Sequence, residues 1–246
     1  VYPFLDSKKY DEFVGKPLAE IPAPEGDDSY DQYFLKPFFA ALENVGVYPE
    51  VIDNYQGYKD GKYNSCIKSI MENSDSVRDI LETVSGRQLP KQWAPWTFKN
   101  DKGILCNGNL INYEWPYAIF TDVEGKEFTN DLSKGEGKLP WRLDWPSKWK
   151  ILGVTFEAFG KDHATKGGSF DTGKHITRDV LNSKEPHHIV YEWINLKGQG
   201  AMHSSTGLAI SAEEMLKMAP PEVIRWLIMK PQPNRHIDFD PGFGLL

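Results

Sequence analysis

Two neighbouring hydroxyl groups stand among glycines in the segment KGQGAMHSSTG, residues 197–207. This segment separates an apolar stretch, YEWINL, from a stretch with helical spacing, SAEEMLKMA. A surface connection could have this sequence. Alternatively, backbone N–H groups and the hydroxyls of Ser204 and Ser205 close over a phosphate, because glycine lets consecutive N–H groups point at one anion. These residues alone leave both interpretations open.

A second polar cluster, GKDHATKGGSFDTG at residues 160–173, directly follows the apolar stretch VTFEAFG. In open α/β sheets, ligands collect at the carboxyl ends of strands, and this places Lys161, Asp162 and His163 where a substrate would bind. A helix that starts at Asp171 or Thr172 after glycines would favour an anion there. The alternative is that Asp162 and Thr172 only cap helices and that His163 is an ordinary polar residue.

A third cluster, KLPWRLDWPSKWK at residues 138–150, places basic side chains among three tryptophans. Lys138, Arg142 and Lys148 could hold phosphates while the indoles stack on bases. The alternative is a solvated face whose tryptophans belong to the core. The net charge of −7 argues against a general nucleic-acid coat but does not exclude local binding.

Metal chemistry receives little support from the sequence. His163, His175 and the pair His187 and His188 match no zinc spacing. The two cysteines, Cys66 and Cys106, form neither a disulfide framework nor a metal set, which is typical of a reducing cytoplasm. We therefore expect no protein-bound zinc.

The elements that must position these clusters follow from periodicity and from turn residues. No apolar run reaches the ~18 residues that cross a bilayer and no signal peptide is recognisable, so the sequence predicts a cytoplasmic protein with no membrane partner. The start at Val1 and the apolar end FGLL suggest a segment of a longer protein.

Apolar residues at helical spacing predict helices at residues 30–46, 62–84, 211–218 and 221–230, near 146–153 and after 169–173. The first of these helices contains Pro37, where we expect a kink or a restart. Strand-like stretches predict strands at 47–55, 154–160 and 189–196, of which 154–160 would be buried, and short antiparallel strands between 91 and 137.

Taken in order, four long stretches resemble the class I lysyl-tRNA synthetases of the archaeal type. These stretches are LPWRLDWPSKW, LGVTFEAFGKDHATKGGSFDTG, YEWINLKGQGAMHSSTG and PPEVIRWLIMKPQPNRHIDFDPGFGLL. The similarity is dense from about residue 138 to the end and extends more loosely through VGKPLAEIPAPEG. Several long motifs in the same order are far more specific than any one of them.

The resemblance implies an α/β fold class: part of a Rossmann-type nucleotide-binding fold of a class I synthetase, interrupted by a small antiparallel β insertion. Residues 1–90 would be the latter part of the first catalytic half, and residues 91–137 a connective insertion similar to a degenerate zinc ribbon that retains only Cys106. Residues 138–246 would be the second catalytic half with the start of a region that contacts the tRNA stem. The family's HIGH-like motif would precede Val1, and its anticodon-binding region would follow Leu246.

The resemblance also implies a function: ATP-dependent ligation of L-lysine to tRNA-Lys through lysyl-adenylate, with Mg²⁺. The loop at 201–207 takes the place of the family's mobile KMSKS-type loop, so Met202, His203, Ser204 and Ser205 would act on the triphosphate. Lys161, Asp162 and His163, the helix-opening Asp171 and Thr172, and the aromatic Trp145 and Tyr191 would form the lysine and ATP pocket. Lys138, Arg142 and Lys148 remain the candidates for contact with tRNA.

Two departures from the family's pattern, the missing ribbon cysteines and an altered loop, keep other functions open. Ala201 and Thr206 stand where lysine is frequent in the loop, and His203 stands where serine is usual. One alternative is a degenerate relative that binds tRNA without acylating it. The other is a class I relative for a different amino acid, such as glutamate.

Overall fold

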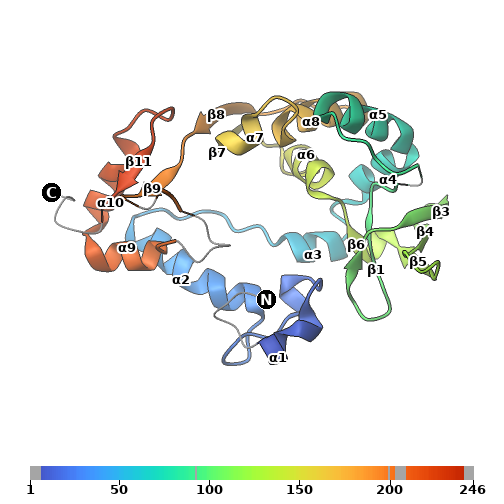
Figure 1. Cartoon of the computed structure of the whole chain (residues 1–246), viewed down its shortest axis with the longest axis horizontal. Helices are drawn as coiled ribbons and strands as arrows, with labels where there is room; N and C mark the ends of the chain where they lie inside the picture. The colour runs from blue at the N-terminus through green and yellow to red at the C-terminus, as the bar shows by residue number, and fades with distance from the viewer. Residues whose placement is uncertain (1–6, 92, 199, 203–208, 241–246) are drawn as a thin grey trace. The chain divides into compact units, whose positions relative to one another are not determined.

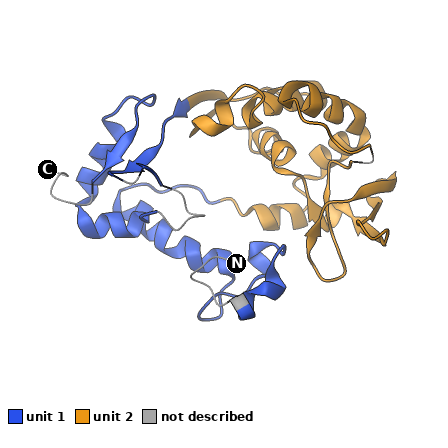
Figure 2. Cartoon of the chain, in the orientation of Figure 1, with its two compact units in different colours: residues 1–51, 190–246 blue, residues 52–189 orange. Residues whose placement is uncertain are grey.

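The chain divides into two compact units in the computed structural model, which describes residues 7–91, 93–198, 200–202 and 209–240. Unit 1 combines residues 1–51 with residues 190–246, and unit 2 is the continuous segment 52–189 between them (Figure 2). These units group the chain by compactness. The expected division at residues 91 and 138 concerns catalytic halves and an insertion, and it stays a prediction.

Unit 1 contains helices of four to fifteen residues and a small three-stranded sheet (Figure 1). Its elements are the helices α1 Ser7–Tyr10, α2 Tyr30–Asn44, α9 Ala212–Met218 and α10 Pro221–Met229, the 3₁₀ turns η1 Asp11–Phe13 and η2 Leu18–Glu20, and the strands β9 Ile194–Leu196, β10 Gly200–Ala201 and β11 Ile237–Phe239. Strand β9 lies in the middle, antiparallel to β10 and parallel to β11. The buried apolar cluster of this unit contains Leu196, Ala219, Ile224 and Phe239.

Local signals explain where the helices of unit 1 begin. Ser211 and Glu214 form a capping box at the start of α9, in which each side chain accepts the other residue's backbone N–H. Helix α10 begins with Pro221, whose missing N–H costs nothing at the first helical position. Helix α2 continues through Pro37 as one element, so the expected restart there does not occur. Arg225 of α10 donates to the carbonyl oxygen of Val45 at 2.7 Å, which ties α10 to the end of α2.

Unit 2 holds the larger core. Its helices are α3 Asn54–Lys59, α4 Asn64–Glu72, α5 Ser74–Ser85, α6 Trp141–Leu152, α7 Lys161–Ala164 and α8 Ser169–His175, with the turns η3 Leu132–Lys134 and η4 Ile176–Val180. Its strands are β1 Thr97–Lys99, β2 Leu105–Cys106, β3 Asn109–Glu114, β4 Tyr117–Thr121, β5 Glu127–Asp131, β6 Gly137–Lys138, β7 Phe156–Gly160 and β8 His187–Tyr191, the last of which ends in unit 1. Mixed helix and strand content confirms the predicted α/β class.

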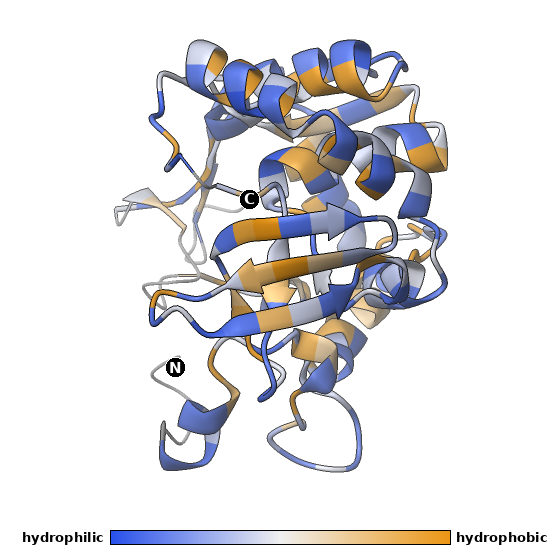
Figure 3. Ribbon diagram, turned by 90° about the vertical axis from the view of Figure 1, so that its right-hand side faces the viewer, coloured by the Kyte–Doolittle hydropathy of each residue, from blue (hydrophilic) through white to orange (hydrophobic). Residues whose placement is uncertain are grey.

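The strands between residues 97 and 138 form two small antiparallel sheets, as the turn-rich sequence predicts. Their strand orders are β2-β1-β6 and β3-β4-β5; β3, β4 and β5 lie side by side in Figure 3. Side chains alternate across β4, so Ala118 and Phe120 enter the core while Tyr117 stays exposed. Phe98 stacks on Phe120 with ring centroids 5.4 Å apart, which joins the two sheets.

Two predicted elements are wrong, and side-chain hydrogen bonds explain both. The strand predicted at 47–55 does not form. Instead Asp53 accepts the N–H of Gln56 at 2.9 Å and caps α3. The single helical run predicted at 62–84 is two helices, because Asn73 ends α4 and its side chain bonds the carbonyl oxygen of Ser69.

The stretch at 154–160 was expected to be a buried strand in an open sheet. It forms β7, which pairs with β8 in a two-stranded sheet, and Phe159 is its buried residue. The following helix begins at Ser169, two residues before the expected start at Asp171. The strand predicted at 189–196 is divided between β8 and β9.

Candidate functional site: an aromatic and histidine cluster in unit 2

Helix α6 presents three indoles along one face. Trp141, Trp145 and Trp149 recur every four residues and therefore follow one another on the helix surface. The ring of Trp145 stacks on Trp141 with centroids 5.3 Å apart and an interplanar angle of 16°, and it meets Trp149 at 5.1 Å. Trp145 is 5% exposed and Trp141 is 48% exposed. The row therefore runs from solvent into the core.

His163 completes this cluster from α7, the short helix that follows β7. Its ring lies 5.3 Å from Trp145 and 5.8 Å from Trp141. The structure thus brings together His163 and Trp145, two of the residues predicted to form the pocket. An imidazole held against indoles can exchange hydrogen bonds with a ligand while the rings enclose an apolar or planar group.

Strands β7 and β8 and helix α8 supply the remaining rings. Phe159 meets Trp145 edge to face at 5.3 Å and lies 4.7 Å from Phe170. His188 stacks on Phe159 at 5.5 Å and approaches Phe170 at 4.3 Å. The histidine pair at 187 and 188, considered in the sequence for metal, thus contributes an aromatic contact here. Among the described residues, no group of three His, Cys, Asp or Glu side chains could hold a metal ion.

Glu157 of β7 is the acidic side chain at this cluster, and the sequence did not single it out. Its Oε1 accepts the indole N–H of Trp145 at 2.8 Å, and its Oε2 accepts that of Trp149. Period-two alternation from the buried Phe159 could have identified it, because residues 157 and 159 must share one face of the strand.

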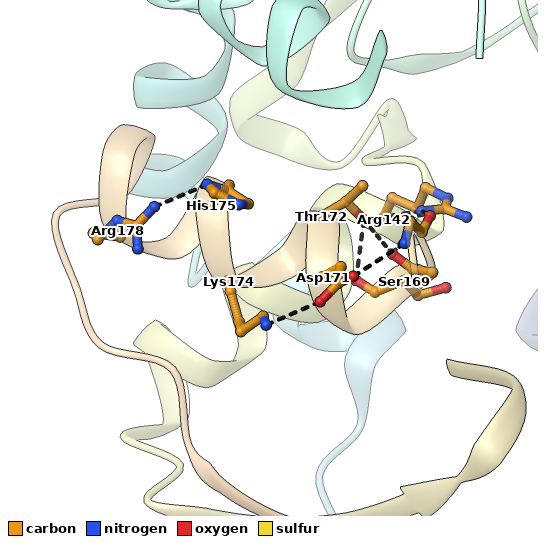
Figure 4. A network of polar contacts seen from close by, with 9 residues as sticks. Arg142, Ser169, Asp171, Thr172, Lys174, His175 and Arg178 are labelled. Carbon is orange, nitrogen blue, oxygen red and sulfur yellow. Dashed lines mark hydrogen bonds and ion pairs between the residues drawn. The ribbon is translucent and has the colours of Figure 1, made fainter. Parts of the chain in front are cut away.

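The loop between α7 and α8 is held by Arg142 (Figure 4). Its Nη1 lies 3.1 Å from the carbonyl oxygen of Gly167, 2.9 Å from that of Gly168 and 3.0 Å from the hydroxyl of Thr172. Partial burial lowers the pKa of Arg142, and the charge of Arg87 adds to this effect. Arg142 was predicted to contact tRNA, but in this structure its Nη1 binds the protein's own backbone.

Asp171 and Thr172, expected to open a helix at a ligand, stabilise the start of α8. Asp171 accepts the N–H of Gly167 at 3.0 Å and pairs with Lys174 at 2.9 Å. The hydrogen bond from Lys174 lowers the pKa of Asp171, assisted by Gly167 and opposed by partial burial. Thr172 is fully buried, and its hydroxyl lies 3.1 Å from the carbonyl oxygen of Gly168. At the other end of α8, Arg178 contacts the ring of His175 (Figure 4).

The other predicted residues of unit 2 lie around this cluster. Lys161 and Asp162 are on α7 with His163, and Asp162 is exposed. Lys148 pairs with the buried Asp144 at 2.7 Å, so its charge is already balanced. Lys138 is exposed on β6 and pairs in register with Thr97.

The remaining predicted residues belong to unit 1. Tyr191 ends β8 and is 48% exposed. His203, Ser204 and Ser205 lie outside the described residues. Met202 donates its N–H to Ile194 at 3.3 Å and packs against the apolar cluster of unit 1, as Ile210 does beyond the loop.

Lys197, at the start of the loop sequence, forms an ion pair with Asp240 at 2.7 Å. Its ammonium, which could otherwise approach an anion held by the loop, is shared with a carboxylate in this structure.

Comparison with known proteins bears on the whole chain. The family described as "tRNA synthetases class I (K)" matches residues 1–246. The lysine–tRNA ligase of Picrophilus torridus is 45% identical over 100% of this chain and 49% of its own length. The lysine–tRNA ligase of Thermoplasma acidophilum is 44% identical over 100% of this chain and 48% of its own length. That of Methanosarcina barkeri is 45% identical over 100% of this chain and 46% of its own length.

The chain spans about half the length of the curated relatives it matches. A glutamate–tRNA synthetase structure from Elizabethkingia anophelis aligns over 80% of this chain and 50% of its own, at 11% identity and a TM-score of 0.40, a similarity too weak to add to the assignment. The family match and the relatives at 44–45% identity agree over the full length of the sequence. This chain therefore belongs to the class I (K) tRNA synthetases, the family that contains these lysine–tRNA ligases.

Proposed function

We propose that the chain is part of a lysine–tRNA ligase, which uses ATP and Mg²⁺ to join L-lysine to tRNA-Lys through lysyl-adenylate in the cytoplasm. The observation that carries this proposal is the match of the whole chain to lysine–tRNA ligases at 44–45% identity. The aromatic and histidine cluster of unit 2 is consistent with it, since aromatic rings can wall the aliphatic part of lysine or the adenine ring.

The reaction would proceed in two steps. The lysine carboxylate attacks the α-phosphorus of ATP and pyrophosphate leaves, and the 2′-hydroxyl of the terminal adenosine then takes the lysyl group from AMP. Such displacements depend on positioning and on stabilisation of charge, and they need no covalent nucleophile from the protein.

We assign the roles as follows. Trp145 forms one side of the amino-acid pocket, and His163 and Asp162 of α7 contact the substrate. Arg142 and Asp171 hold the loop between α7 and α8 beside them. The loop at 201–207 would close over the triphosphate, and Tyr191 would be a second aromatic residue of the lysine pocket.

The finer fold assignment is part of this proposal. The chain would supply part of a Rossmann-type nucleotide-binding fold of a class I synthetase, with residues 91–137 as a connective insertion that packs without zinc. The antiparallel sheets β2-β1-β6 and β3-β4-β5 and the apolar stack of Phe98 on Phe120 support an insertion held by packing.

The test is lysine-dependent ATP–pyrophosphate exchange, measured with and without tRNA-Lys on this chain and on the complete product of its gene. Exchange with lysine, but not with glutamate, supports the proposal. Binding of tRNA-Lys without exchange in the complete product would instead identify a relative that no longer acylates tRNA. Exchange that depends on glutamate would identify a different amino-acid substrate.

The variant His163→Ala tests the pocket assignment in the same assay. We expect kcat/KM for lysine to fall about ten- to a hundredfold, because misplacing a bound substrate by ~1 Å can cost ~10²-fold. The matched control is His175→Ala, which removes an exposed imidazole that bonds to Arg178 outside the cluster. Equal kcat/KM in the two variants would refute the role of His163.

A further inference from the structure

We propose that Glu157 is a positioning residue of the amino-acid pocket. Its carboxylate fixes the indole planes of Trp145 and Trp149, and through Trp145 it fixes the surface against which His163 and the substrate pack. This inference rests on the proposed function, because it assigns to Glu157 an effect on lysine binding.

The position of Glu157 in β7 is the first observation. Glu157 and the buried Phe159 share the face of β7 toward α6, whereas Phe156 points away and is 51% exposed. An apolar residue at 157 and a polar one at 156 would be the ordinary arrangement of a strand with one covered face. A carboxylate placed among aromatic rings loses hydration, so it persists there only with hydrogen-bond donors.

The geometry of those donors is the second observation. Trp145 and Trp149 are one helical turn apart on α6, and their indole N–H groups bond to different oxygens of the same carboxylate. In this geometry each indole N–H has its own acceptor oxygen, so the two oxygens of one carboxylate satisfy both indoles at once. A glutamine offers one acceptor oxygen and one NH₂ group, so one indole N–H would face another donor.

The effect on the pocket follows from the freedom of the indole ring. The χ2 torsion of tryptophan is broad and roughly two-fold, so the torsional preference alone does not fix the ring orientation. The bond to Glu157 selects the orientation in which Trp145 stacks on Trp141 at 16° and lies 5.3 Å from His163. Loss of that bond would tilt the wall of the amino-acid pocket.

The experiment measures KM and kcat for lysine and KM for ATP in pyrophosphate exchange, using the complete gene product. The test variant is Glu157→Gln. The control is Glu185→Gln, which removes one carboxylate in the same way from an exposed residue before β8. We expect Glu157→Gln to raise KM for lysine about tenfold, the effect of losing one hydrogen bond to a charged group, with KM for ATP within about twofold. Glu185→Gln should leave all three values unchanged.

Two further readouts separate positioning from a general structural role. In ¹⁵N-labelled protein, the indole N–H resonances of Trp145 and Trp149 should shift together in Glu157→Gln, with the indoles outside the α6 row (Trp141, Trp145 and Trp149) unmoved. Adding Trp149→Phe to Glu157→Gln removes the competing donor, so the amide oxygen can turn to Trp145. The double variant should therefore recover most of the lost affinity for lysine.

Each outcome decides the proposal. Shifted indole resonances with an unchanged KM for lysine overturn it, as does a parallel rise in KM for both lysine and ATP with no recovery in the double variant. An unmodified protein without lysine-dependent exchange overturns both this inference and the proposed function. An active protein in which Glu157→Gln has no effect overturns the inference alone.

Discussion

Two buried tyrosine hydroxyl groups of unit 2, those of Tyr58 and Tyr113, differ in their hydrogen-bond partners. Tyr58 donates to Asp144 at 2.7 Å and accepts the N–H of Leu139 at 3.2 Å. Burial, together with the nearby carboxylate of Asp144, raises the pKa of Tyr58 well above its usual value. The hydroxyl of Tyr113 is also buried, but it has no hydrogen-bond partner within the described part of the chain. The two residues therefore form a matched pair for testing what a buried hydroxyl contributes.

Replacing Tyr58 with phenylalanine should destabilise the protein. The change leaves the buried oxygen Oδ1 of Asp144 and the N–H of Leu139 without their partner, so we expect the free energy of unfolding to fall by about 1–3 kcal/mol. Tyr113→Phe removes an unsatisfied hydroxyl and should leave this free energy equal or higher. Urea denaturation at pH 7 measures both. A loss in Tyr113→Phe as large as in Tyr58→Phe would contradict this account.

Tyr113 should contribute to the decrease of the free energy of unfolding at alkaline pH. Burial, with a smaller effect from the carboxylate of Glu72, raises the pKa of Tyr113 from 10 to about 12. Below pH 10 the phenol is protonated in folded and unfolded chains alike. Between pH 10 and about 12 only the unfolded chain loses this proton. The contribution of Tyr113 to the free energy of unfolding therefore declines over that window. The free energy of unfolding should therefore fall less steeply in Tyr113→Phe than in the unmodified protein. Parallel curves would contradict this expectation.

The residues of the candidate site were predictable only in part. Trp145 and His163 were selected because they lie in stretches that resemble the family, and the structure brings their rings together. Glu157 was missed because its bonding partners lie on a different element: period-two alternation places it on the same face as Phe159, but its bonds to Trp145 and Trp149 depend on tertiary contact. Arg142 was assigned to tRNA from its neighbours in sequence, whereas its bonds to Gly167 and Gly168 depend on tertiary contact.

Among the elements, prediction succeeded where the signal is local. Gly86 ends α5 in a left-handed conformation, as the glycine after the apolar run indicates. The helices near 211–218 and 221–230 were also predicted, and they begin at the capping box of Ser211 and at Pro221. Prediction failed at 47–55, where β-branched residues favoured a strand but the cap formed by Asp53 starts a helix.

The turn before α8 depends on a glycine at position 167. Gly167 has a φ of +72°, and a Cβ there would lie 2.8 Å from the carbonyl oxygen of Val84. Gly153→Ala is the matched control, because Gly153 has a φ of +61° with nothing within 4 Å of a Cβ.

Gly167→Ala should therefore cost more stability than Gly153→Ala. Both variants bear the roughly 1–2 kcal/mol of a left-handed alanine, and only Gly167→Ala adds a backbone clash. Thermal unfolding compares them. Equal melting temperatures of the two variants would show that the backbone near Gly167 moves to accept a Cβ without loss of stability.

At the scale of the whole molecule, the two units differ in how their cores are formed. Unit 2 is one continuous segment and contains large, fully buried side chains, including Trp96, Trp149 and Phe98. Unit 1 has a small described cluster, and its two segments are separated in sequence by all of unit 2. No local pattern in the sequence indicates this separation, because the parallel pairing of β9 with β11 and the contact of Arg225 with Val45 depend on long-range packing.

Unit 2 should fold by itself. We expect a fragment of residues 52–191, which keeps β8 complete, to unfold cooperatively and to retain the near-ultraviolet circular dichroism of its stacked tryptophans, because its core is contained within the segment. Calorimetry of the fragment and limited proteolysis of the whole chain measure this. A fragment without a cooperative transition would show that the core of unit 2 depends on residues outside it.

Helix α2 packs against α9, but roughly 170 residues separate them in the chain. The ribosome therefore synthesises α9 long after α2. A ribosome that adds about 5–20 residues per second needs roughly ten to thirty seconds to reach α9 after completing α2. During that interval the nascent helix carries Phe34, Phe38 and Leu42 without the segment that later covers part of it. The order of synthesis therefore leaves α2 without its partner α9 throughout the time in which unit 2 is made.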